Sequence, residues 1–132
     1  MITVLFACVH NAGRSQIAAA LFNRHANPTK ARAISAGTHP ADRVHPEVVE
    51  LMHGIGIDLS GQHPQKLTDQ LAAEAQWLIT MGCGDECPLV PGAKRDDWPL
   101  PDPKGQTMAA VREIADEVDR RVVALIAEHG WQ

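Results

Sequence analysis

Short apolar runs alternate along this chain with segments of helical periodicity. Residues 2–7, ITVLFA, form a short apolar run, and residues 31–37, ARAISAG, and 77–81, WLITM, are expected to be the second and third strands. Runs of this length predict strands that are buried on both faces of a parallel sheet. A weaker fourth strand is expected around Lys94–Trp98.

The first two expected helices follow the first and the second of these runs. Ser15 is a suitable N-cap for a first helix over Gln16–His25, whose apolar residues recur at helical spacing. Pro46 is placed for the first turn of a second helix. That helix should end at Gly54 and Gly56.

Two further helices follow. Thr68 predicts the start of a short helix over 69–75. The last helix has the clearest apolar face and should end at Gly130. That face comprises Met108, Val111, Ile114, Ala115, Val118, Val122, Leu125 and Ile126.

Strands that alternate with helices predict an α/β fold, with a parallel sheet covered on both faces. The length of 132 residues fits one domain over 1–132. Ligands of such folds bind beyond the carboxyl ends of the strands. Cys8, Cys83 and Cys87 all follow predicted strand ends, so we expect them to converge on one rim.

Charge and cysteine content narrow the function classes. The net charge of −4 and the lack of a Lys/Arg block argue against nucleic acid or a membrane surface as the main partner. The N-terminal residues 1–10 lack the basic segment of a signal peptide, and the apolar run is too short to span a membrane. Three cysteines fit a reduced cytoplasm, where they are catalytic, redox-active or metal-binding more often than structural.

The loop CVHNAGRS, residues 8–15, joins the first predicted strand to the first predicted helix. A loop that wraps into a helix N-terminus turns backbone N–H groups inward and can hold a tetrahedral oxyanion. Arg14 adds a planar two-pronged donor for its oxygens. The same positive surroundings favour a thiolate at Cys8, so the loop predicts a nucleophile inside an anion-binding cradle.

Each loop residue has an expected part. Gly13 should permit a backbone conformation that β-branched residues resist, and Asn11 should bond across the loop. Ser15 should donate its hydroxyl to the Cys8 sulfur, whereas His10 should point outward, since a thiolate needs no base. The alternative is an inert buried cysteine beside a capping serine. The predicted oxyanion-binding residues are Val9, His10, Asn11, Ala12, Gly13 and Arg14.

A proton donor for the leaving oxygen is expected at Asp102. This aspartate lies between Pro101 and Pro103, which stiffen the backbone around it. A rigidly held carboxyl is suited to general acid catalysis. An Asp-Pro pair is by itself more often a turn than an acid.

Cys83 and Cys87 are the first and last residues of the short segment CGDEC. They could be ordinary loop cysteines, half of a zinc site, or a redox pair that relays a disulfide. The seven histidines of the chain have no zinc-ligand spacing to this pair, which disfavours zinc.

Taken together, these segments resemble the low-molecular-weight protein tyrosine phosphatases and the arsenate reductases built on the same fold. The resemblance covers essentially the whole chain. The chain contains no tyrosine, which favours the reductases over the tyrosine phosphatases. It implies a flavodoxin-like three-layer sandwich with a four-stranded parallel sheet. The segments that carry it are CVHNAGRSQ, ISAGTHP, GIDLSGQHPQKLT, MGCGDECP and the stretch from Trp98 to Asp102-Pro103.

This resemblance implies arsenate reduction for arsenic detoxification. Cys8 would attack arsenate and Asp102 would protonate the departing oxygen, as the matching Asp-Pro of the family does. Cys83 would displace arsenite, and Cys87 would resolve the Cys8–Cys83 disulfide. A thioredoxin-type protein would then reduce the enzyme, or a small thiol such as mycothiol or glutathione would serve the middle step. No metal or tightly bound cofactor is expected.

The chain departs from the better-known thioredoxin-coupled members in two places. Its relay cysteines are closer together, and Ala19 stands where those members have an acidic residue of a potassium site. Two rival functions stay open. A phosphatase would hydrolyse a phospho-Cys8 with water, and a non-catalytic regulator would bind anions or clamp arsenite between Cys83 and Cys87.

Overall fold

The computed structural model describes residues 1–82 and 92–132 of the chain. Its four strands form one parallel sheet in the order β2-β1-β3-β4, as the sequence predicts. The strands are β1 (Ile2–Cys8), β2 (Ala31–Gly37), β3 (Trp77–Thr80) and β4 (Lys94–Asp97). Cys83 and Cys87 lie outside the described residues.

Four helices of the described residues accompany the sheet. They are α1 (Arg14–His25), α2 (Pro46–Gly54), α3 (Asp69–Ala73) and α4 (Met108–His129). Thr68 caps α3 by accepting a hydrogen bond from Leu71 N, as predicted. The expected capping of α1 by Ser15 is wrong, because α1 begins at Arg14 and the Ser15 hydroxyl bonds to other side chains of the preceding loop.

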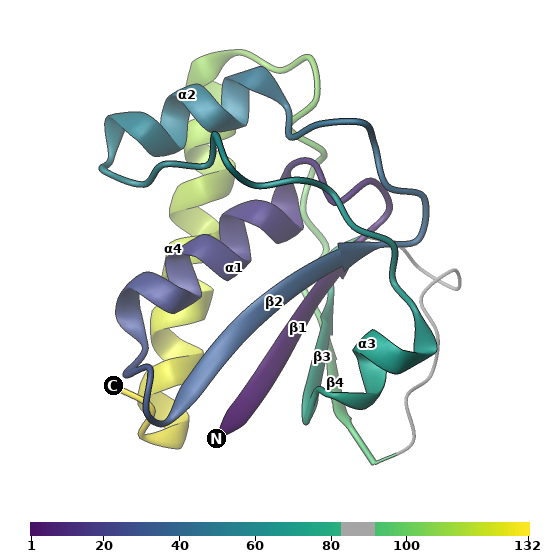
Figure 1. The fold of residues 1–132 in the computed structure, drawn as a ribbon. Coiled ribbons are helices and arrows are strands. Elements are labelled where there is room, and N and C mark those ends of the chain that lie inside the picture. The colour runs from purple at the N-terminus through teal and green to yellow at the C-terminus, as the bar shows by residue number, and fades with distance from the viewer. Residues whose placement is uncertain (83–91) are drawn as a thin grey trace.

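The sheet has helices on both faces, which gives the predicted three layers (Figure 1). Figure 1 shows α1, α2 and α4 on one side of the sheet and α3 on the other. Successive residues of β1 alternate between these layers: Val4 and Phe6 pack toward the larger helical layer, and Leu5 and Ala7 toward α3. All four side chains are fully buried, which explains the continuous apolar run.

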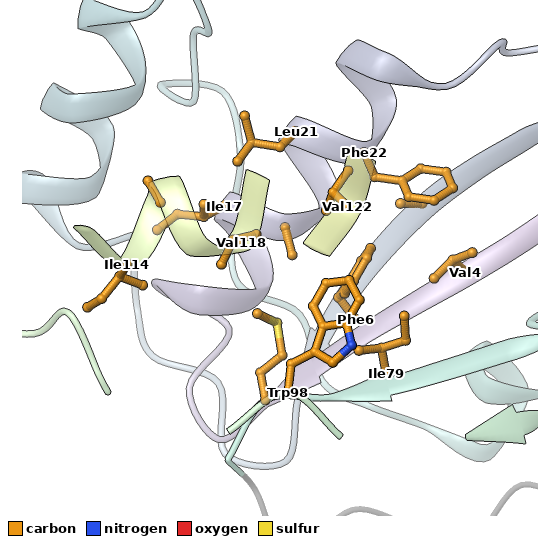
Figure 2. Close-up of a cluster of buried hydrophobic side chains, with 14 of the residues drawn as sticks. Val4, Phe6, Ile17, Leu21, Phe22, Ile79, Trp98, Ile114, Val118 and Val122 are labelled. Atoms are coloured by element: carbon orange, nitrogen blue, oxygen red, sulfur yellow. The ribbon is translucent and has the colours of Figure 1, made fainter. Parts of the chain in front are cut away.

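The main core lies between the sheet and the α1–α4 pair (Figure 2). Phe6 is at its centre, with its ring centroid 6.1 Å from that of Phe22 and 5.5 Å from that of Trp98. The predicted apolar face of α4 is buried from Val111 onward. Met108 is an exception at 38% exposure, because this first residue of α4 precedes the turn that packs onto the core. None of the helices in residues 1–82 and 92–132 combines the length and the hydropathy of a membrane-spanning segment.

The carboxyl ends of the parallel strands meet at one edge of the sheet, as expected. β1 pairs with β2 up to Cys8 and Gly37, and with β3 up to Ala7 and Thr80. The loop after β1 therefore lies beside the segment that follows β2 (Figure 1), and Gly82, just after β3, lies against Arg14 at the start of α1. This edge is where the candidate site is built.

Replacing the central aromatic side chain should destabilise the fold strongly. Phe6→Ala removes a fully buried ring from between two other aromatic rings, and we expect it to lower the free energy of unfolding by about 3–5 kcal/mol. Urea denaturation measures this loss. Val123→Ala is the control, since Val123 is 44% exposed, and its effect should stay within about 0.5 kcal/mol. An equally small loss for Phe6→Ala would contradict the described core.

Candidate active site

The backbone carbonyl groups of the loop after β1 point away from the interior of the loop and accept hydrogen bonds there. Those of Asn11 and Gly13 accept from Gln16 Nε2 at 3.1 Å and from Ile17 N at 3.0 Å. Four other carbonyls accept hydrogen bonds from backbone N–H groups of segment 38–45. Cys8 O accepts from Thr38 N at 3.2 Å, and Val9 O accepts from His39 N at 2.8 Å. His10 O accepts from Ala41 N, and Ala12 O accepts from His45 N, both at 2.9 Å. The C=O and N–H of a planar trans peptide point to opposite sides. The N–H groups of residues 9–14 are therefore turned toward the inside of the loop.

Asn11 holds this loop together from within. Its side chain is fully buried, and its backbone has a φ of 50°, in the left-handed region that Asn tolerates better than most residues. Its Nδ2 donates to Ser15 Oγ at 2.7 Å, and its Oδ1 accepts from Gln65 N at 3.0 Å and from Gln16 Nε2 at 3.2 Å. The predicted bond of Asn11 across the loop is therefore present.

Cys8 has two hydrogen-bonding neighbours at its sulfur. Asn11 N donates to Cys8 Sγ at 3.3 Å, and Ser15 Oγ lies 2.9 Å from the same sulfur. Because Ser15 Oγ already accepts from the Asn11 amide, its own proton can be directed at Cys8. Cys8 is 2% exposed. His10 lies away from the sulfur, as expected, with Nδ1 3.1 Å from the His39 carbonyl oxygen.

Arg14 is held between the loops that follow β3 and β4. Its Nη1 donates to the carbonyl of Leu100 at 3.0 Å, and its Nη2 lies 4.0 Å from Asp102 Oδ2. Gly82, with a φ of 96°, lies so close that a Cβ there would overlap the Arg14 guanidinium. The guanidinium is thus buried and fixed by backbone on two sides.

Gly13 is needed for space, which the sequence does not reveal. A Cβ on Gly13 would lie 2.5 Å from Pro103 Cγ and 3.3 Å from His45 Cδ2. Because Gly13 has no Cβ, the segment that carries Asp102 can approach the loop. Asp102 is half-buried there, and its Oδ1 accepts from Lys104 N at 3.0 Å.

His45 is a residue of the site that the sequence analysis missed. Its Nε2 is buried without a hydrogen-bond partner and lies 3.9 Å from Asp102 Oδ1. Burial lowers the pKa of His45 below its ordinary value. The carboxylates of Asp102 and Glu47 raise that pKa, but the effect of burial is larger. The imidazole is therefore neutral near pH 7. Only the place of His45 directly before Pro46, at the start of α2, could have marked it in the sequence.

The fold brings most of the predicted site residues together. One connected cluster contains Cys8, Asn11, Gly13, Arg14, Ser15 and Asp102. It combines a buried sulfur, a ring of inward amides, a guanidinium and a carboxyl group, which suits attack on a tetrahedral oxyanion. Cys83 and Cys87, the other two predicted site cysteines, lie outside the described residues. In the rest of the chain, no group of three His, Cys, Asp or Glu side chains could hold a metal ion.

Comparison with known proteins gives a consistent set of relatives. A family model described as low molecular weight phosphotyrosine protein phosphatase matches residues 3–130. The glutaredoxin arsenate reductase of Synechocystis sp. is 34% identical over 128 residues, which are 95% of this chain and 96% of that protein.

Two solved structures are similar in both fold and sequence. The thioredoxin-dependent arsenate reductase of Corynebacterium glutamicum has a TM-score of 0.84 and 41% identity over 97% of this chain, which spans only 61% of that protein's length. An arsenate reductase in its phosphate-binding state has a TM-score of 0.83 and 33% identity, over 97% of this chain and 98% of its own.

The buried His45 should make the protein less stable in acid. Its pKa is lower in the folded chain than in the unfolded chain, so at a pH between the two values only the unfolded chain binds a proton there. The free energy of unfolding should therefore fall as the pH drops below about 6.5, by at most about 1.4 kcal/mol per pH unit. Urea denaturation at about pH 5 and about pH 7.5 measures the effect. His45→Gln, which cannot titrate, should depend less on pH, and equal dependence in the two proteins would contradict the assignment.

Proposed function

The chain belongs to the low molecular weight phosphotyrosine protein phosphatase family, and within this family we propose that it is an arsenate reductase. The observation that carries the oxyanion chemistry is the loop of residues 8–15, whose outward-bonded carbonyls turn its amides inward, with the Asn11 amide at the Cys8 sulfur. The sequence relatives with 34% and 41% identity, both arsenate reductases, support arsenate as the oxyanion.

The first step is attack on bound arsenate. The amides of residues 9–14 and the Arg14 guanidinium hold the arsenate oxygens, and the two donors at Cys8 Sγ stabilise a thiolate nucleophile. The sulfur forms a bond to arsenic while one arsenic–oxygen bond breaks. Asp102, near Arg14, gives that oxygen a proton, so it leaves as water.

The second step transfers electrons to arsenic. The Cys83 thiolate attacks the Cys8 sulfur and forms a Cys8–Cys83 disulfide. The electron pair of the sulfur–arsenic bond stays on arsenic, which leaves as arsenite. Cys87 then attacks Cys83, which frees the Cys8 thiolate and leaves a Cys83–Cys87 disulfide. This relay rests on residue types and family resemblance, because both cysteines lie outside the described residues.

A thioredoxin-type protein supplies the two electrons that reduce this disulfide. The relative from Corynebacterium glutamicum is thioredoxin-dependent, which supports this partner. The Synechocystis relative is a glutaredoxin arsenate reductase, and it makes a small-thiol route the second candidate. Either route needs reduced thiols, so we place the reaction in the cytoplasm.

Arsenate turnover tests the proposed function directly. With thioredoxin, thioredoxin reductase and NADPH, the protein should consume NADPH in proportion to the arsenite formed. Cys8→Ser should abolish this turnover because it removes the nucleophile. Asp102→Asn should slow the single-turnover rate by about 10²–10⁴-fold while phosphate inhibition is retained.

The rival phosphatase gives the opposite result in this assay. It would hydrolyse aryl phosphates through Cys8 but leave arsenate and NADPH unchanged. That combination would contradict arsenate reduction. Binding of arsenate or arsenite without either activity would indicate the non-catalytic regulator.

Single cysteine replacements test the relay, since each should stop it at a different covalent state. Cys87→Ser should release one arsenite and stop as the Cys8–Cys83 disulfide. Cys83→Ser should stall before release, with arsenic still on Cys8, because no thiolate attacks the adduct. Intact and peptide mass spectrometry after one turnover identify these states. Thioredoxin-dependent turnover of Cys87→Ser at the wild-type rate would contradict the relay and favour the small-thiol route.

A further inference from the structure

The Nε2 atom of His45 faces the proposed acid, Asp102, and has no hydrogen-bond partner in the part of the chain that the structure describes. Among the buried side-chain nitrogen and oxygen atoms of the described residues, His45 Nε2 is the one without a hydrogen-bond partner. Leaving a polar atom buried and unpaired costs about 1–3 kcal/mol. Asp102 Oδ1, 3.9 Å away, is the carboxylate oxygen it faces.

The position of His45 is set by the backbone of the same site. Its N–H donates to the carbonyl of Ala12, and its carbonyl accepts from Val48 N and Val49 N in the first turn of α2. Its ring lies over Gly13, where a Cβ would be 3.3 Å from His45 Cδ2. The His45 backbone is thus fixed to the anion-binding loop, whereas the Asp102 side chain, at 39% exposure, has room to rotate toward the ring.

We propose that His45 is a positioning residue for Asp102, a role that rests on the proposed function. His45 is neutral with its proton on Nε2, and this N–H donates to Asp102 Oδ1 when an oxyanion is bound. The pair must close by about 1 Å to reach hydrogen-bond distance. Catalytic hydrogen bonds are often longer in the free enzyme than in the complex.

This bond decides which carboxyl oxygen carries the acid proton. Asp102 Oδ1 already accepts from Lys104 N at 3.0 Å. A second donor from His45 occupies its other acceptor position, so the proton resides on Oδ2. Oδ2 is the oxygen on the Arg14 side, 4.0 Å from Nη2, where the leaving oxygen of the bound anion is to be protonated.

A neutral ring is required for this role, and its surroundings supply it. Among the described residues, the charged and titratable groups that act on His45 are Asp102, Glu47, Lys104 and His10, and Arg14 lies on the other side of Asp102. A protonated His45 would add a second cation beside Asp102 and favour loss of the acid proton. Burial counteracts that charging.

A double-mutant cycle tests the role through its dependence on Asp102. His45→Leu removes the donor and should lower the single-turnover rate at saturating arsenate by about tenfold, the equivalent of one hydrogen bond. His45→Gln presents an amide N–H and should stay within about threefold of wild type. In the Asp102→Asn background, His45→Leu should have no further effect. Phosphate inhibition, which should not change, verifies that each variant keeps its anion loop.

Equal losses from His45→Leu in both backgrounds, or an equal loss in His45→Gln, would overturn the proposal. Two readouts need no arsenate turnover: nitrogen NMR of the ring should show the Nε2–H tautomer, and a phosphate complex should bring Nε2 within about 3.2 Å of Oδ1. The Nδ1–H tautomer or an open pair in that complex would refute it. If wild type forms no arsenite, the proposed function fails, and the same cycle on phenyl phosphate hydrolysis decides the pairing.

Discussion

Two neighbouring backbone segments, the loop after β1 and the segment after β2, run side by side because their strands pair up to Cys8 and Gly37. Gly37 permits this closeness, since a Cβ there would lie 2.7 Å from Val9 O and 2.9 Å from Asn11 N. The second segment bonds four carbonyls of the first, and peptide planarity then turns the amides of residues 9, 10, 11 and 13 inward. The anion-binding geometry is therefore a consequence of strand pairing.

Burial of polar side chains completes this geometry. Asn11, Ser15 and Gln16 are each at most 5% exposed and bond to one another or to the loop backbone. Buried polar groups cost little when they are fully paired, and each becomes costly once its partner is removed. The network therefore fixes the loop before any anion arrives, so that its dipoles need not reorient during the reaction.

The sequence was sufficient for the parts of the molecule that depend on local pattern. Apolar runs identified β1 and β3 because both of their faces are buried, whereas β4 is exposed and has no such run. Contiguous residues 8–15 identified the loop. Ser15 was wrongly predicted as a helix cap because its hydroxyl bonds to Asn11 and Cys8. Helix-capping propensity does not take such tertiary hydrogen bonds into account. His45 and the Leu100 carbonyl were missed because they reach the site only through folding. A backbone acceptor has no sequence signature.

The loop and the acid suit a phosphatase as well as a reductase, so what distinguishes the two functions is the group that attacks the Cys8 adduct. In this chain both candidate thiols belong to the segment that follows β3. Its last described residue before them, Gly82, lies against the Arg14 guanidinium that would hold the anion. Asp102 approaches the same guanidinium from the segment after β4. Gly82 and Asp102 therefore approach the Arg14 guanidinium from two separate segments, and this geometry is common to both functions.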